Sequence, residues 1–280
     1  MDLNVSNQLL DEFAQLVKKN QAARKVSEGE KLKVGVDLGT SSIVLAVLDH
    51  EDNPIYGNFQ YADVVRDGIV VNYIESVQIL KKLKAQAEEV LGVELLSASG
   101  AIPPGTGENS QKIVANVIGD AGFIPQAIVD EPTAAAKFLH LDDGSVIDVG
   151  GGTTGISNFQ DGQQLSVFDE PTGGFHMSLV LAGAKGITVD EAELLKREAP
   201  NEKEIFGVIR PVAEKMASIS KQYVVAKEED PVLLVGGATN FTDFIPTFTK
   251  VMKRPVVGPH FPQFVTPLGI AMYDQGELDE

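Results

Sequence analysis

Residues 146–159 read Val-Ile-Asp-Val-Gly-Gly-Gly-Thr-Thr-Gly-Ile-Ser-Asn-Phe. A short apolar strand that carries one acid, Asp148, runs into a cluster of glycines and hydroxyl residues. Glycine accepts positive φ angles and lets the backbone approach a ligand closely, and successive free N–H groups in such a turn suit an anion. An acid beside the turn can hold a metal ion that bridges phosphate oxygens. This stretch therefore predicts one half of a nucleotide-phosphate site. The residues of this second glycine turn are Gly150, Gly151, Gly152 and Thr153.

The same pattern occurs once more, earlier in the chain. Residues 33–49 contain an apolar strand, Asp37, a glycine followed by hydroxyl residues, and a second apolar run. The residues of this first glycine turn are Gly39, Thr40 and Ser41. One copy alone is explained equally well by an ordinary β-hairpin with a tight turn. Two copies in step indicate a duplicated phosphate-binding hairpin, with Asp37 and Asp148 in matching positions.

Composition limits the functions that need to be considered. The chain has 280 residues, of which 43 % are apolar, so a packed core of one large or two smaller domains is expected. The net charge of −17 argues against a nucleic-acid surface, which needs clustered Lys and Arg. The absence of cysteine excludes disulfides, and the four histidines show no ligand spacing. No run approaches the ~20 apolar residues of a membrane span and no secretory signal is visible, so a cytoplasmic protein without membrane contact is expected.

Residues 1–26 predict an amphipathic helix, and a linker follows it up to residue 30. Leu9, Phe13, Leu16 and Val17 fall on one face of this helix. Two interpretations stay open at this point. The helix packs on the body of the protein, or it detaches and enters a groove on a partner.

Between the two glycine turns, residues 130–136 read Asp-Glu-Pro-Thr-Ala-Ala-Ala. Pro132 suits the first turn of a helix, and the three alanines give that helix a smooth face that another helix can approach closely. Glu131 has two explanations: an acid favoured by the helix dipole, or a residue that orients an attacking water. Its place between the two glycine turns makes it a candidate for the second role.

Two familiar nucleotide motifs are excluded. The chain contains no Gly-x-x-x-x-Gly-Lys-[Ser/Thr] sequence, so it is not a P-loop protein. Residues 150–155 match Gly-x-Gly-x-x-Gly, and Asp169 and Glu170 lie at about the spacing of a ribose-binding acid. A dinucleotide fingerprint must open a helix, however, whereas residues 156–168 predict a strand, an Asp-Gly turn and a second strand. A Rossmann dehydrogenase is therefore not expected.

Five segments together resemble the nucleotide-binding motifs shared by actin, the sugar kinases and the DnaK-type chaperones. In the family's order of phosphate 1, connect 1, phosphate 2, adenosine and connect 2, they lie at residues 34–49, 130–136, 146–159, 232–248 and 266–272. The Glu-Pro-Thr-Ala-Ala-Ala and Asp-x-Gly-Gly-Gly-Thr sequences are typical of the chaperone and bacterial-actin branch. Within that branch, the compact length and the N-terminal helix most resemble the EutJ family of chaperone-like proteins of ethanolamine utilisation, which are associated with bacterial microcompartments.

This resemblance implies an α/β protein with the actin-like ATPase fold. Two ribonuclease-H-like lobes would surround a nucleotide cleft, and the outer subdomains would be reduced. Residues 1–30 would form the N-terminal helix and linker, residues 31–142 together with 262–280 would form lobe I, and residues 143–261 would form lobe II.

The resemblance also implies a role for each matched residue, with ATP and Mg²⁺ as cofactors. Asp37 and Asp148 would act on Mg²⁺ or its waters and Glu131 would position a water, which makes these three the expected catalytic residues. Glu193 and Lys196 match the Glu-x-x-Lys helix that holds the ribose in the chaperones. The other expected nucleotide contacts are Gly39, Thr40, Ser41, Gly150, Gly151, Gly152 and Thr153 in the turns, Gly174 near the phosphates, and Gly236, Gly237 and Ala238 on the adenosine side.

Four departures from the pattern argue against fast catalysis. Gly155 stands where chaperones and bacterial actins usually carry an acid, and residues 57–73 contain no counterpart of the chaperone lysine that reaches the phosphates. The outer subdomain expected after Gly174 is reduced to about residues 183–187, and no β-rich peptide-binding domain follows. Binding with slow or no turnover fits this sequence better than chaperoning of the DnaK kind.

Three functional hypotheses follow from the resemblance. The first is an ATP-binding, chaperone-like protein of ethanolamine utilisation, a weak or slow ATPase whose lobes close on nucleotide. The second is a microcompartment assembly adaptor with little or no catalysis, and the third is a filament-forming bacterial actin homologue. A sugar or acetate kinase is a more distant alternative. The expected partners are ATP or ADP and other proteins of ethanolamine utilisation or of a microcompartment shell, with microcompartment association as an alternative to a purely cytoplasmic location.

Overall fold

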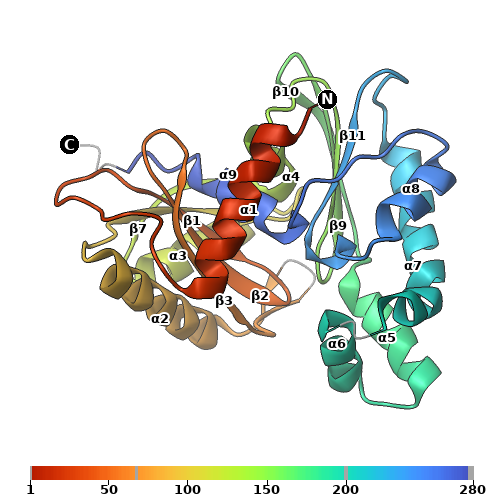
Figure 1. The fold of residues 1–280 in the computed structure, drawn as a ribbon, viewed down its shortest axis with the longest axis horizontal. Coiled ribbons are helices and arrows are strands. Elements are labelled where there is room, and N and C mark those ends of the chain that lie inside the picture. Colours follow the sequence, from red (N-terminus) through yellow and green to blue (C-terminus); the bar gives the residue numbers. More distant parts are fainter. Residues whose placement is uncertain (1, 67–68, 199–200, 277–280) are drawn as a thin grey trace.

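The computed structural model describes residues 2–66, 69–198 and 201–276. Asp67 and Gly68, where the sequence predicts a turn, lie outside the described residues. So do Met1, at the start of the predicted N-terminal helix, and residues 277–280, at the end of the predicted lobe I. Within the described ranges the chain forms two larger β-sheets, each covered by helices (Figure 1).

The first sheet contains five strands in the order β3, β2, β1, β6 and β7. Their bounds are β1 Lys33–Leu38, β2 Ser42–Leu48, β3 Pro54–Tyr61, β6 Ser97–Ile102 and β7 Ile124–Asp130. Strand β1 pairs antiparallel with β2 and parallel with β6, so the β1–β2 hairpin lies inside the sheet. The helices α2 Tyr73–Leu91 and α3 Glu108–Asp120 pack on this sheet, and a short pair, β4 Val65–Arg66 and β5 Ile69–Val70, connects β3 to α2.

The second sheet contains four strands in the order β10, β9, β8 and β11. Their bounds are β8 Gly144–Val149, β9 Thr154–Gln160, β10 Gln163–Glu170 and β11 Val232–Val235. Asp161 and Gly162 have φ angles of 52° and 71° and form the turn that joins β9 to β10. This confirms the predicted strand–turn–strand and excludes the helix that a dinucleotide fingerprint would need.

The helices of the second half gather beside this sheet, on the right of Figure 1. They are α5 Gly174–Lys185, α6 Val189–Glu198, α7 Glu202–Tyr223, η1 Gly237–Thr239 and α8 Phe244–Met252. Their apolar faces build one core with the sheet, in which Ile147, Phe206 and Phe244 are buried. Pro211 lies inside α7, which continues through it. No helix in the described part of the chain is long and apolar enough to cross a membrane.

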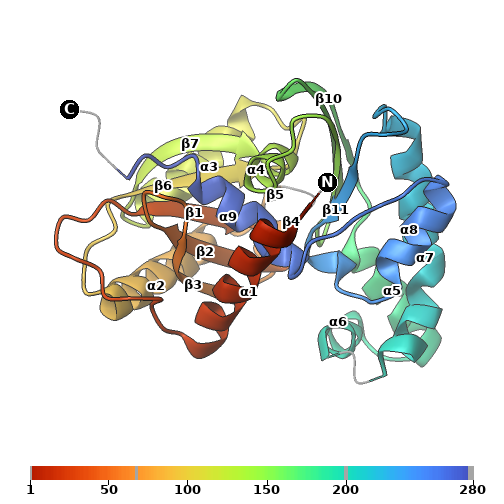
Figure 2. The same cartoon turned by 45° about the horizontal axis from the view of Figure 1, so that its top comes forward.

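Two helices meet between the sheets, α4 Glu131–Phe138 and α9 Val265–Ala271, which follows η2 Pro262–Phe264 (Figure 2). The Asp130 carboxylate caps α4 by accepting a hydrogen bond from the Thr133 N–H over 2.9 Å. The helices are in backbone contact, because a Cβ atom on Gly269 would lie 2.0 Å from the Ala134 carbonyl oxygen. The close approach predicted for the alanine face of α4 is therefore confirmed.

Helix α1, Asn4–Lys19, is packed on the body of the protein. Leu10 and Phe13 are fully buried, and the Phe13 ring meets the edge of Phe264 with 5.1 Å between ring centroids. Both residues belong to a core that includes residues of both sheets, among them Val44 and Val146. The first interpretation of the N-terminal helix, docking on this same chain, is therefore the one that the structure bears out.

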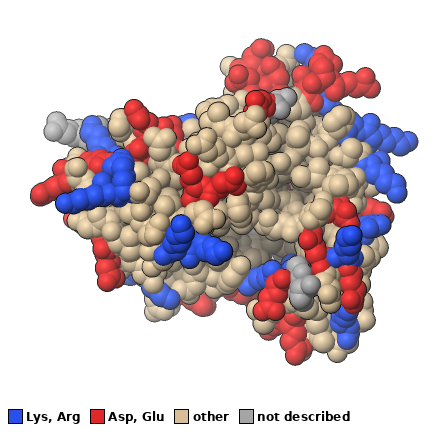
Figure 3. Space-filling view, viewed as in Figure 1, with Lys and Arg blue, Asp and Glu red and all other residues tan. Residues whose placement is uncertain are grey.

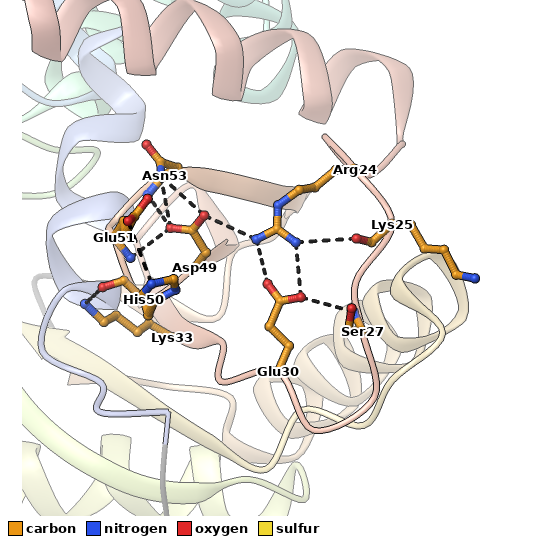
Figure 4. Close-up of polar contacts among 9 residues, drawn as sticks. All are labelled: Arg24, Lys25, Ser27, Glu30, Lys33, Asp49, His50, Glu51 and Asn53. Atoms are coloured by element: carbon orange, nitrogen blue, oxygen red, sulfur yellow. Dashed lines mark hydrogen bonds and ion pairs between the residues drawn. The ribbon is translucent and has the colours of Figure 1, made fainter.

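Polar contacts hold the segment between α1 and β1 against the β2–β3 turn (Figure 4). The Arg24 guanidinium contacts both carboxylate oxygens of Glu30, over 2.6 and 3.1 Å, and one oxygen of Asp49 over 3.3 Å. Lys33 pairs with Asp52 over 2.6 Å. Bidentate Arg–carboxylate contacts fix geometry better than single ion pairs, so the segment predicted as a linker has a defined path.

Candidate functional site

The two glycine turns have the same construction. In the first, the Gly39 N–H donates to the Ser42 carbonyl over 3.0 Å, and in the second the Gly150 N–H donates to the Thr153 carbonyl over 3.0 Å. Asp37 and Asp148 each stand two residues before that glycine, on β1 and β8. The duplication inferred from sequence is thus a duplication of backbone geometry.

The turns lie against each other where the two sheets meet. A Cβ atom on Gly151 would lie 2.4 Å from the Ser41 hydroxyl oxygen, so only glycine permits this approach. None of Gly39, Gly150, Gly151 and Gly152 adopts a positive φ angle. Close packing of the opposite turn, rather than a left-handed backbone, explains the glycine at residue 151.

A cavity of about 430 Å³ opens between the halves of the molecule that carry the two sheets. Figure 3 shows the surface hollowed in the middle of this face, with acidic side chains spread around it. The structure brings every residue predicted for the site to this one cavity. Its lining includes Asp37, Gly39, Thr40, Ser41, Glu131, Asp148, Gly150, Gly151, Gly152, Thr153, Gly174, Glu193, Lys196, Gly236, Gly237 and Ala238.

Three carboxylates converge in the cavity from β1, β8 and the start of α4. Asp148 is buried, whereas Asp37 and Glu131 are half-buried because they face the cavity. Burial, followed by the negative charge of Asp148, raises the pKa of Asp37 to about 7. Burial raises the pKa of Asp148 to about 6, although the Thr266 hydroxyl opposes this by donating to Asp148 over 2.7 Å. Burial and then the charges of Asp148 and Asp37 raise the pKa of Glu131 well above its ordinary range.

Such a group of acids suits a divalent cation that takes only some of its ligands from the protein. Within the described residues, no three His, Asp or Glu side chains form a complete protein cage for a metal. Mg²⁺ does not need one, since it keeps several waters and binds through one or two carboxylates together with phosphate oxygens. The donor set of Asp37 and Asp148 fits that ion.

Helix α6 supplies a compact ionic group to the lining of the cavity. The Lys196 ammonium donates to the Gly174 carbonyl over 2.8 Å, to the Ser178 hydroxyl over 2.9 Å and to Glu193 over 2.6 Å. An ammonium has three N–H donors, so these acceptors engage all of them. Burial lowers the pKa of Lys196. For Glu193 burial acts in the opposite sense to its partners, and the charge of Lys196 nevertheless holds its pKa below the usual range.

Gly155 lies in a tight space between two prolines. A Cβ atom there would lie 3.1 Å from the side-chain carbons of Pro104 and of Pro132, the residue after Glu131. Two prolines therefore occupy the space next to the position where chaperones and bacterial actins usually carry an acid.

Several cavity residues were not predicted. Tyr61 on β3, Arg197 on α6, Gln263 on η2 and Thr266 on α9 all line the cavity. The sequence held a signal for two of them. Arg197 stands four residues after Glu193, at the spacing of helical ion pairs, and Tyr61 alternates with Phe59 along β3, so both rings point to one face.

His176 does not join the ionic group. Its ring nitrogen Nδ1 accepts a hydrogen bond from the Gly173 N–H over 3.4 Å at the start of α5. Its ring therefore contributes to the start of α5.

Comparison with known proteins places the chain in a family. The Hsp70 protein family model matches residues 72–174. The ethanolamine utilization protein EutJ of Salmonella typhimurium is 39 % identical over 243 residues, which cover 86 % of this chain and 85 % of that protein. The chain belongs to the EutJ family. A solved EutJ from Carboxydothermus hydrogenoformans is 42 % identical and has a TM-score of 0.92, with 98 % of this chain and 100 % of that chain covered.

A more distant likeness confirms the fold class beyond EutJ. MreB5 of Spiroplasma citri, solved bound to AMPPNP, has a TM-score of 0.69 at 14 % identity, with 87 % of this chain and 96 % of that chain covered. At such low identity the likeness shows the fold alone. The predicted actin-like ATPase architecture is therefore confirmed for this EutJ homologue.

Proposed function

We propose that this protein binds Mg-ATP in the cleft and that its lobes close on the nucleotide. One observation carries the proposal: both glycine turns and three buried or half-buried acids line a single cavity. The turns offer backbone N–H groups to phosphate oxygens, and Asp37 and Asp148 would hold Mg²⁺ directly or through its waters. Mg²⁺ would neutralise phosphate charge and relieve the repulsion among the acids. MreB5, which shares the fold, was solved bound to AMPPNP, and this supports a nucleotide as the ligand.

Glu193, with Lys196 beside it, and the segment Gly236, Gly237 and Ala238 would contact the nucleoside end of the ligand. This assignment rests on the resemblance of their sequence pattern to the chaperones, and their place in the lining of the same cavity as the glycine turns supports it. The lobes would be residues 31–142 with 262–280 and residues 143–261, because each range contains one sheet and one glycine turn.

Hydrolysis in this site would be slow. Glu131 is the only acid of the three that starts a helix rather than preceding a glycine turn, which suits it to orient a water. In the cation-free site, burial and the charges of Asp148 and Asp37 raise its pKa and so disfavour the charged form that would attract the water's proton. The prolines around Gly155 crowd the position from which a further acid could assist it.

The cellular role that fits is a chaperone-like step of ethanolamine utilisation, the process named for the EutJ relatives. In this role the protein would act in the cytoplasm on other proteins of the pathway or on a microcompartment shell. A cleft that closes on ATP without rapid turnover would serve as a nucleotide-dependent clamp on such a partner.

Titration calorimetry with Mg-ATP tests the binding proposal. We expect the Asp148→Asn variant to weaken binding at least about tenfold, because one of two Mg²⁺-side charges is lost (a charge-assisted contact contributes about 1.5–3 kcal/mol). The matched control is Asp161→Asn, the same change in an exposed turn whose φ of 52° asparagine tolerates well. Absence of binding by the unaltered protein at millimolar Mg-ATP would refute the function, and equal binding by both variants would refute the site.

A second candidate function, an assembly adaptor that gains little from catalysis, is favoured by the surroundings of Gly155. Phosphate-release assays and co-sedimentation separate the alternatives. An adaptor retains partner association when ATP is replaced by a non-hydrolysable analogue, whereas a filament-forming actin homologue sediments alone when ATP is added.

A further inference from the structure

One contact crosses the mouth of the cleft. The guanidinium carbon of Arg197, on α6, lies 3.8 Å from the centroid of the Tyr61 ring, on β3 of the first sheet. Both residues line the cavity, and Tyr61 is 54 % exposed, so its ring stands at the rim rather than in the core. An arginine over an aromatic face forms an attractive cation–π pair, and this attraction is lost when the two partners move apart.

Arg197 is held in place from behind. Its Nε–H donates to Glu193 over 2.9 Å, and Glu193 in turn accepts from Lys196. Because both charged neighbours lie on one helix turn, the guanidinium has little freedom to follow Tyr61 if the ring moves away. Tyr61 is supported in the same way by Phe59, whose ring meets it edge-on at 5.0 Å between centroids.

The same helix is linked to the second glycine turn. Lys196 donates to the Gly174 carbonyl, and the Gly174 N–H donates to the Gly150 carbonyl over 2.9 Å. The next amide, that of Phe175, donates to the Gly151 carbonyl over 2.8 Å. A displacement of the second glycine turn is therefore passed through α5 to Lys196, and from Lys196 to Glu193 and Arg197.

We propose that Tyr61 and Arg197 form a latch across the cleft and that Glu193 and Lys196 link this latch to the second glycine turn. Arg197 and Lys196 then act as positioning residues: the latch sets how long the cleft stays closed, and the state of the turn sets whether the latch forms. The effect on nucleotide exchange rests on the proposed nucleotide binding, whereas the contact itself does not.

The latch is tested by nucleotide release and by lobe separation in the same variants. Tyr61→Leu removes the ring, and Tyr61→Phe keeps it. We expect Tyr61→Leu to speed release of a fluorescent ATP analogue about two- to fivefold, as the loss of an exposed cation–π pair predicts, with an unchanged melting temperature. Tyr61→Phe should stay near the unaltered protein. Arg210→Gln is the matched control for Arg197→Gln, because Arg210 lies over Phe206 of its own helix and does not cross the cleft.

Lobe separation is measured by electron–electron spin distances, since the cysteine-free sequence accepts a label pair without competing thiols. Lys81→Cys on α2 and Lys203→Cys on α7 place the two labels at exposed positions in different halves. In nucleotide-free protein we expect Tyr61→Leu and Lys196→Gln to broaden the distance distribution. A Lys196 that only bound ribose would leave it unchanged. Ser178→Ala, which removes one of the three Lys196 acceptors, is the milder variant if Lys196→Gln fails to fold.

The outcomes separate cleanly. Unchanged release and unchanged distances in Tyr61→Leu overturn the latch, as do equal effects of Tyr61→Leu and Tyr61→Phe. Additive effects of Tyr61→Leu and Arg197→Gln in the double variant also overturn it, because partners in one contact are not additive. If the unaltered protein binds no nucleotide, the proposed function fails, and the spin distances still decide whether the contact holds the cleft.

Discussion

At the scale of single residues, Asp37 and Asp148 make stability depend on pH. Their pKa values of about 7 and about 6 in the folded protein exceed the ordinary value of 3.8, so the folded state favours their protonated forms. A carboxyl group of this kind contributes stability below its ordinary pKa, and that contribution is lost as the pH rises through the folded value. The relevant window is therefore about pH 4 to 7.

Thermal unfolding in a chelator checks this. We expect the melting temperature of Asp37→Asn, relative to that of the unaltered protein, to rise as the pH increases from 4 to 7. Above pH 7 the difference between the two melting temperatures should stay constant. The reason is that asparagine cannot take the unfavourable charge. Excess Mg²⁺ should reduce the difference most at high pH, where the acids are ionised. Parallel curves for the two proteins would contradict the assignment, and Asp161→Asn should run parallel to the unaltered protein.

Some residues of the site could be predicted from local sequence patterns, and others could not. Asp37, Asp148 and Glu131 could be predicted because each stands beside a local turn or helix start whose backbone explains it. The strand pattern indicates the face on which the Tyr61 ring lies, but not its contact with Arg197, since Arg197 lies on a distant helix and the contact depends on how two halves of the molecule sit. The glycines were found for partly the wrong reason: residue 151 needs to be small because Ser41 is close, which no local pattern contains.

At the scale of elements, α1 stabilises the junction of the two sheets. Phe13 is fully buried there, so we expect Phe13→Ala to lower the free energy of unfolding by about 3–5 kcal/mol. Val5, on the same helix and 69 % exposed, gives the control: Val5→Ala should change it by less than about 0.5 kcal/mol. Denaturant unfolding measures both. A small effect of Phe13→Ala would instead favour the second interpretation, in which the helix detaches.

Element types were easier to predict than element ends. Apolar residues at helical spacing begin only near Phe206, yet α7 begins at Glu202, because a polar first turn leaves no periodic signal. The Asp161-Gly162 turn was predicted correctly because its residues accept the positive φ angles that such a hairpin needs. The sequence alone could not decide whether α1 packs on this chain or on a partner. An amphipathic face indicates that some surface covers it, but it does not indicate which surface.

At the scale of the whole molecule, α4 and α9 cross between the two sheets, and α4 contacts strands of both. A Cβ atom on Gly269 would strike the Ala134 carbonyl at 2.0 Å, so we expect Gly269→Ala to cost about 3 kcal/mol or more of unfolding free energy. Gly183, in α5, has open space around it, and Gly183→Ala should instead stabilise by about 0.5–1 kcal/mol. Thermal or denaturant melts compare the two. Equal effects would mean that the crossing is looser than the contact implies.

That crossing also bears on how the proposed lobes could move. Both helices belong to the proposed lobe of residues 31–142 and 262–280, and their backbone contact should make them move together. Helix α4 also packs against β8 and β9 of the other proposed lobe. If the cleft opens as proposed, we expect the lobes to rotate about this junction, so that displacement grows with distance from it. A contact at the rim, such as that of Tyr61 with Arg197, would then feel more of the motion than the junction itself.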